Sequence, residues 1–256
     1  MELNESQYQR VADQLPRQRG NVSLTNLQVL NAVLYVAEHG CKWRGLPKRY
    51  GNWHTIYTRM SRWSRNGVLD RVFTALQREQ IVRPDRGSVA GQHERQSPPG
   101  WHRCAKKNGP QSIGKSRGGW TTKVHMVAAD ARTAITFCLS PGQAHDGKVG
   151  RELLRDLGQA AWPIHLVMDK AYEGDETRQL ALDLGFLPVV PPTSRRLAPW
   201  EYDREMYKRR NQIERLFRRL KGFRRIFSRF EKLDVMYLGF LNFALIIEAL
   251  RSVNTP

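Results

Sequence analysis

Apolar residues recur at spacings of three and four along much of the chain, and this periodicity predicts amphipathic helices. Three such stretches in the N-terminal third are predicted as helices: residues 24–39, about 52–66 and 68–79. We expect Ser23 or Thr25 to cap the first of them and Gly40 to end it. Because a short turn at Gly67 separates the second helix from the third, residues 1–80 predict a small helix-turn-helix-like module. A helical bundle that serves packing alone is the other interpretation.

From Thr121 the pattern changes to the alternation that is typical of strands, and 121–128 and 134–139 predict two strands joined by a turn. Further elements are predicted in this order: a helix at 147–160, a strand at 164–168, a helix at 174–185, a strand at 186–190, a helix at 207–221 and an apolar helix from about 234 to 252. Strands that come first and then alternate with helices predict an α/β domain with a mixed sheet over residues 119–256. The interval 81–118 predicts an irregular basic linker.

The charge of the chain indicates its class of partner. A formal net charge of +18, spread along 256 residues, favours a polyanion and most simply nucleic acid. An anionic membrane or a ribosomal-type structural role would also suit a basic chain. The first residues show no secretory signal, and the longest apolar segment, 235–250, is short for a bilayer. Three cysteines without C-x-x-C spacing argue against a zinc site and a disulfide framework. We therefore expect a cytoplasmic protein that does not associate with membranes.

The predicted helix at 207–221 carries one carboxylate in a row of cations. Arg210, Glu214, Arg218 and Lys221 follow one another at spacings of four, four and three, which places them on one face. Two interpretations fit this face. It is either a solvated surface with ion pairs one turn apart, or a catalytic acid among cations that bind phosphate.

A resemblance to a known family favours the second interpretation. Tyr207, Arg210, Glu214 and Lys221 fill the Y-(2)-R-(3)-E-(6)-K signature, and the chain resembles bacterial insertion-sequence transposases of the DDE type. Further stretches are similar to the subgroup named after insertion sequence five: Trp43-Arg-Gly-Leu-Pro47, Gly109-Pro-Gln-Ser-Ile-Gly-Lys-Ser-Arg-Gly-Gly119, Pro141-Gly-Gln-Ala-His-Asp146 and Asp169-Lys-Ala-Tyr172. These stretches are spread over most of the chain, from residue 43 to residue 221.

The resemblance implies both a fold and an activity. It implies a ribonuclease-H-like mixed sheet flanked by helices, preceded by the helical DNA-binding module. It also implies a transposase that cleaves transposon ends and joins them to target DNA, with Asp169 and Glu214 as catalytic metal ligands. Phosphodiester cleavage of this type uses hard cations, and Mg²⁺ or Mn²⁺ prefers carboxylate oxygens. The implied partner is double-stranded DNA, bound by a homodimer in a bacterial cytoplasm and associated with the nucleoid when bound.

Several cations are candidates for contact with DNA. They fall into three groups: Arg59, Arg62 and Arg65 on the second predicted helix; Lys115 and Arg117 in a glycine-rich loop; and, on the resemblance, Tyr207, Arg210, Arg218 and Lys221 around Glu214. The glycine-rich loop also fits the P-loop pattern G-x-x-x-x-G-K-[ST]. A P-loop needs a buried strand before it and a helix after it, and neither flank fits, so we favour contact with DNA over nucleotide hydrolysis.

The first acid of the family's triad has no clear counterpart. The family places it on the first core strand, but the interval 83–105 is rich in proline and glycine and predicts no strand. Asp85 and Glu94 are its acids, and Asp85 is only a nominal substitute. A permitted choice of codons for Gly91 to Ala105, read one nucleotide later, encodes Asp-Ser-Thr-Ser-Val-Lys-Val-His-Pro-Asp-Gly-Thr-Gly-Ala, which resembles the missing strand.

We therefore hypothesise that about residues 84–105 are translated out of frame. The chain would then have lost its first metal ligand, and the alternative function is an inactive transposase relic that only binds DNA. Sequencing the coding DNA tests this hypothesis. The shifted frame is expected to encode the peptide given above, and any other sequence there would refute it.

Overall fold

The computed structural model describes residues 2–81, except 19 and 21, and residues 111–252, except 118, 161 and 162. The chain divides into two compact units, which we call the helical unit (Met1–Val82 with Leu216–Pro256) and the α/β unit (Arg83–Arg215). The interval 82–110, which contains Asp85, Glu94 and the whole of the hypothesised frame-shifted segment, lies outside the described residues.

The helical unit consists of short helices with clear start and stop signals. Its elements in the N-terminal part are α1 (Glu5–Ala12), α2 (Asn26–His39), η1 (Trp43–Gly45), η2 (Lys48–Tyr50), α3 (Trp53–Arg65) and α4 (Val68–Ile81). Thr25 and Gln28 form a reciprocal capping box at the start of α2, and Gly40 ends it with φ +66°, a conformation that favours glycine. The predicted helices at 24–39, 52–66 and 68–79 are thus confirmed as α2, α3 and α4.

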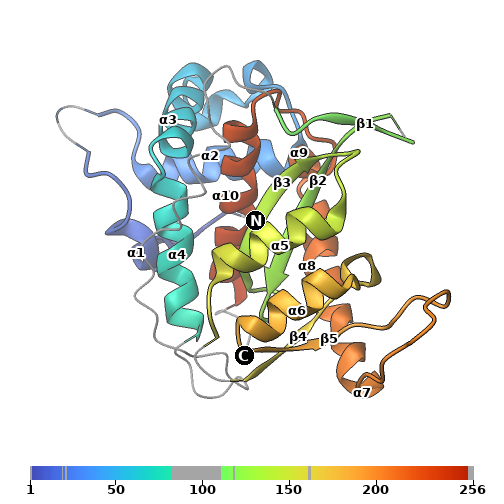
Figure 1. The fold of residues 1–256 in the computed structure, drawn as a ribbon. Helices are drawn as coiled ribbons and strands as arrows, with labels where there is room; N and C mark the ends of the chain where they lie inside the picture. The colour runs from blue at the N-terminus through green and yellow to red at the C-terminus, as the bar shows by residue number, and fades with distance from the viewer. Residues whose placement is uncertain are drawn as a thin grey trace. The chain divides into compact units, whose positions relative to one another are not determined.

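The C-terminal helices pack with the N-terminal ones. α9 (Arg224–Phe227) contacts α2, and α10 (Asp234–Ser252) lies against α3 and α4 (Figure 1). α10 approaches α3 closely at Gly239, where an added Cβ would lie 2.1 Å from the hydroxyl oxygen of Ser64. The expected segment 119–256 is therefore divided, because the apolar surface of α10 is buried by the N-terminal helices.

The α/β unit contains two small sheets. Its elements are β1 (Gly114–Ser116), β2 (Gly119–Ala128), β3 (Ala134–Pro141), α5 (Asp146–Leu157), β4 (Ile164–Val167), η3 (Lys170–Tyr172), α6 (Asp175–Asp183), β5 (Phe186–Val189), α7 (Arg204–Tyr207), η4 (Lys208–Arg210) and the start of α8 (Asn211–Lys221). The order β1-β2-β3 is antiparallel, and β4 pairs with β5 in parallel. Antiparallel and parallel pairs together confirm the mixed α/β character.

Both sheets have an open edge within the described part of the chain. β1 pairs with Gly119–Thr121 of β2, so the rest of β2 has β3 as its one described partner. β4 likewise pairs with β5 alone among the described strands. The apolar cluster beside β4 and β5 combines Leu154 and Leu157 of α5, Ala181 of α6 and Phe186. These contacts position the end of β4, where the candidate catalytic aspartate lies.

One predicted helix differs from the structure. A single helix was expected at 207–221, but the chain forms α7, the 3₁₀ turn η4 and then α8. Apolar spacing does not reveal this break, because over a single turn a 3₁₀ helix and an α-helix place the same side chains on one face. Arg210 lies in the tightened turn, and its ion pairs are described below.

Buried Arg225 joins α9 to the segment before α3. Its guanidinium donates to Oε1 of Glu231 from Nε (2.8 Å) and Nη2 (2.6 Å), and Nη1 donates to the carbonyl of Cys41 (2.6 Å). The side chains of Arg225 and Glu231 are 8% and 12% exposed, and the guanidinium also lies over the ring of Trp43. All partners of this cation belong to the helical unit.

We predict that Arg225→Ala lowers the free energy of unfolding of the helical unit by about 3 kcal/mol, because Glu231 is left as an unpaired buried charge. Arg224→Ala, on the same helix but exposed, is the control and should change it by no more than about 0.5 kcal/mol. Urea denaturation followed by circular dichroism measures both. Equal values for the two variants would contradict this role of Arg225.

Candidate active site

Asp169 stands where a strand ends and a turn begins. The last β4 contact is the hydrogen bond from Met168 N to the carbonyl of Val189 (3.0 Å), and Asp169 is the N-cap of η3. The amide of Tyr172 donates back to the carbonyl of Asp169 (2.9 Å). The Asp169 side chain is 53% exposed, so its carboxylate is open to solvent while its backbone is held on both sides.

Arg210 brings Asp169 and Glu214 together. Its Nη1 donates to Oδ2 of Asp169 (2.8 Å), and its Nη2 lies 2.7 Å from Oε1 of Glu214. The planar guanidinium offers its donors in a fixed fork, so one side chain can bind two carboxylates at once. Asp169 at a strand end and Glu214 on the first turn of α8, which are distant in sequence, thus converge on one cation.

Tyr207 lies beside this group. Burial raises the pKa of its phenol above the ordinary value, and the charges of Asp169 and Glu214 act in the same direction, whereas Arg210 opposes them. The ring of Tyr207 also meets Tyr202 edge-on, with 5.7 Å between centroids. The structure therefore gathers Tyr207, Arg210 and Glu214 of the signature with Asp169.

The remaining signature cations lie further along α8. Arg218 and Lys221 are exposed and follow Glu214 by one and two turns. Arg219, between them, faces Glu248 with 3.8 Å between Nη1 and Oε2. The spacing predicted for the charged face of the helix is thus present from Glu214 onward.

The donor chemistry of the group suits a hard divalent cation only in part. Asp169 and Glu214 supply exposed carboxylate oxygens, the ligands that Mg²⁺ prefers. Among the described residues there is no cluster of three or more His, Cys, Asp or Glu side chains arranged to hold a metal. The described part of the chain therefore offers two candidate ligands, Asp169 and Glu214.

Comparison with known proteins identifies the family. Residues 92–247 match the family model described as "Transposase DDE domain", and this range covers more than half of the chain and includes both carboxylates. The chain belongs to the DDE-domain transposases. Residues 3–73 match a second family, described as "Putative transposase of IS4/5 family".

Two curated relatives of this transposase are also similar in sequence. A protein of Brucella ovis named "Putative transposase for insertion sequence element IS6501" is 31% identical over 125 residues, which are 48% of this chain and 94% of the relative. "Uncharacterized protein y4sN" of Sinorhizobium fredii is 32% identical over 80 residues, 30% of this chain and 64% of the relative. No solved structure matches the chain significantly.

The predicted DNA-contacting arginines of α3 differ in their surroundings. Nη1 of Arg59 donates to the carbonyl of Leu24 (2.9 Å), and burial lowers the pKa of this half-buried guanidinium. Arg62 and Arg65 are exposed. The three-residue spacing thus yields two exposed cations of the transposase rather than three.

The glycine-rich loop of the transposase is a hairpin. Lys115 and Arg117 are exposed, and β1 pairs with β2 where a P-loop would require a helix, so this part of the loop does not have P-loop geometry. Trp120 lies opposite Lys115 in the register and is 74% exposed. Sequence reasoning missed Trp120, because it lies one residue before the predicted strand at 121–128.

No helix among the described residues has the length and apolar character needed to span a membrane.

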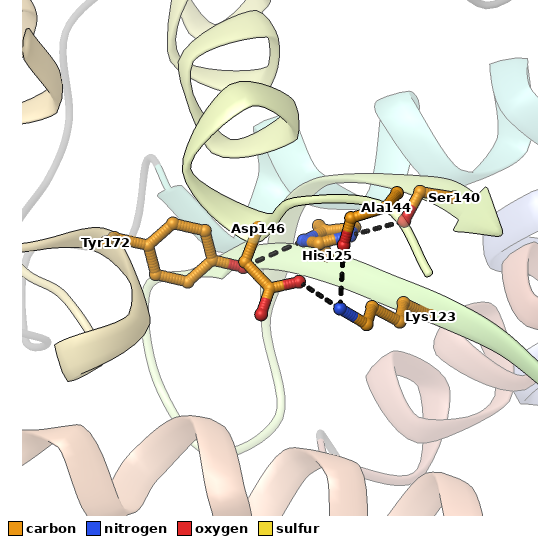
Figure 2. Close-up of polar contacts among 6 residues, drawn as sticks. All are labelled: Lys123, His125, Ser140, Ala144, Asp146 and Tyr172. Atoms are coloured by element: carbon orange, nitrogen blue, oxygen red, sulfur yellow. Dashed lines mark hydrogen bonds and ion pairs between the residues drawn. The ribbon is translucent and has the colours of Figure 1, made fainter. Parts of the chain in front are cut away.

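A buried polar group beside Asp169 was also missed. Nδ1 of His125 lies 2.8 Å from the Tyr172 hydroxyl, and Nε2 lies 2.8 Å from the Ser140 hydroxyl (Figure 2). Next to them, Nζ of Lys123 pairs with Oδ1 of Asp146 at 2.7 Å. His145 is the N-cap of α5, and its side chain makes no capping hydrogen bond.

Proposed function

We propose that this chain is a metal-dependent DNA transposase that cleaves the ends of its element and joins them to target DNA. The observation that carries the proposal is the simultaneous pairing of Arg210 with Asp169 and Glu214 in a chain of the DDE family. Asp169 and Glu214 would hold Mg²⁺ or Mn²⁺. When bound, such a cation stabilises the charge that develops on the oxygens of the reacting phosphodiester.

The other residues of the group have roles in binding and orientation. Arg210 fixes the two carboxylates relative to each other, and the protonated Tyr207 can donate a hydrogen bond to a phosphate oxygen. Arg218 and Lys221 on α8 would contact the DNA backbone as point charges along the same helix face. Lys115 and Arg117, with Arg62 and Arg65, would add contacts to phosphates that do not depend on base sequence.

We further propose that the α/β unit has a ribonuclease-H-like sheet and that the helical unit contains the DNA-binding module. The open edges of β2 and β4 support the first point, because one additional strand paired with both would join the two sheets. The family resemblance places that strand before Gly109, outside the described residues. A homodimer on the DNA and a location in the bacterial cytoplasm remain predictions from the family.

Incubation of the purified chain with duplex DNA carrying its element's ends, with and without Mg²⁺, tests this function. We expect strand cleavage that requires Mg²⁺ and falls at least about 100-fold in Asp169→Ala and in Glu214→Ala, because charge stabilisation in the transition state is lost. Binding of the ends should persist in both variants. Asp175→Ala is the control, since Asp175 is also exposed and paired with an arginine, Arg196.

Two other outcomes are informative. Cleavage that survives Asp169→Ala would contradict the assigned site. Specific binding of the ends without cleavage, rescued by restoring the Asp-Ser-Thr reading frame, would identify an inactive relic that only binds DNA.

A further inference from the structure

The turn that presents Asp169 is anchored from behind by the partly buried side chain of Tyr172. Tyr172 ends η3, three residues after Asp169, and its ring lies against α5 at Gly150, where an added Cβ would be 2.5 Å from Cδ1 of the ring. A side chain at position 150 would therefore displace the ring. The phenol reaches across to β2, where it meets His125.

His125 links this turn to the antiparallel sheet. The imidazole is 3% exposed and connects Tyr172 on one side with Ser140 of β3 on the other, at 2.8 Å each (Figure 2). Burial lowers the pKa of His125 and raises that of Tyr172, so both groups are uncharged near neutral pH. A neutral imidazole has one donor and one acceptor nitrogen, and two hydroxyls satisfy both of them. This part of the network is complete, and its central imidazole is buried.

The carboxylate of Asp169 and the anchor of its turn thus lie at opposite ends of η3. The carboxylate is half exposed and contacts Arg210, whereas the hydroxyl of Tyr172 contacts buried His125. We propose that Tyr172 is a positioning residue for Asp169, and that its hydrogen bond to His125 fixes the turn so that the carboxylate is held ready for a divalent cation. This inference rests on the proposed function for the binding of a divalent cation by Asp169.

Tyr172→Phe tests the inference because it removes one hydroxyl and keeps the ring. Mutation of a residue that orients a metal ligand typically weakens metal affinity about 10–100-fold. We therefore expect Mn²⁺ to bind about 10-fold more weakly in Tyr172→Phe. His125→Gln should weaken binding similarly, and the double variant should be no worse than either single one, because both changes break the same contact. Electron paramagnetic resonance of free Mn²⁺ measures the affinity without requiring catalysis.

Tyr237→Phe is the matched control. Tyr237 is a buried tyrosine of the helical unit whose hydroxyl donates to the carbonyl of Ile226 at 3.1 Å. Its loss should lower thermal stability about as much as Tyr172→Phe does but leave Mn²⁺ affinity unchanged. Equal Mn²⁺ affinity in Tyr172→Phe and the wild type would overturn the inference.

Hydrogen exchange separates this inference from the proposed function. Amides of residues 169–173 should exchange faster in Tyr172→Phe than in the wild type, and those residues should be unaffected in Tyr237→Phe. Wild-type chain that binds no Mn²⁺ through Asp169 would contradict the proposed metal site, while faster exchange would still support the anchoring of the turn. Unchanged exchange would overturn the anchoring whether or not the chain cleaves DNA.

Discussion

The ion pairs of Arg210 with Asp169 and Glu214 are the contacts on which the candidate site depends. Two carboxylates that approach each other repel unless a cation lies between them. Here the cation is a guanidinium whose fork reaches both, and it ties the turn after β4 to the first turn of α8. Because both carboxylates are about half exposed, such pairs contribute at most about 1 kcal/mol to stability. The main effect of these ion pairs is therefore to neutralise the two carboxylates locally, and their contribution to the stability of the fold is small.

The turn that carries Asp169 is also held by contacts in the interior of the α/β unit. η3 carries Asp169 at one end and Tyr172 at the other, and Tyr172 is fixed by Gly150 and His125. A carboxylate on an anchored turn keeps its geometry when its counterion changes. The same position can then serve an arginine or, as we propose, a divalent cation.

Local signals in the sequence predicted the elements well. Thr25 and Gly40 marked both ends of α2, and the alternation after Thr121 marked β2 and β3. The resemblance correctly indicated the DDE transposase family, and it singled out Asp169 and Glu214, which the structure brings to one cation. Their role as metal ligands remains a prediction.

Long-range packing could not be predicted in the same way. The pattern of α10 shows that it is buried but not which helices bury it, and the partners prove to be α3 and α4. The break at η4 leaves apolar spacing unchanged, so spacing alone places Arg210 on a regular helix face. His125 and Tyr172 are far apart in sequence, and neither stands in a pattern that would reveal their contact.

Anomalous diffraction from crystals grown with Mn²⁺ is the most direct test of the central claim. The account predicts an anomalous peak within coordination distance of oxygen atoms of both Asp169 and Glu214, with the Arg210 guanidinium displaced from at least one of them. Crystals in which Mn²⁺ binds elsewhere, or in which Arg210 keeps both ion pairs at saturating Mn²⁺, would contradict it.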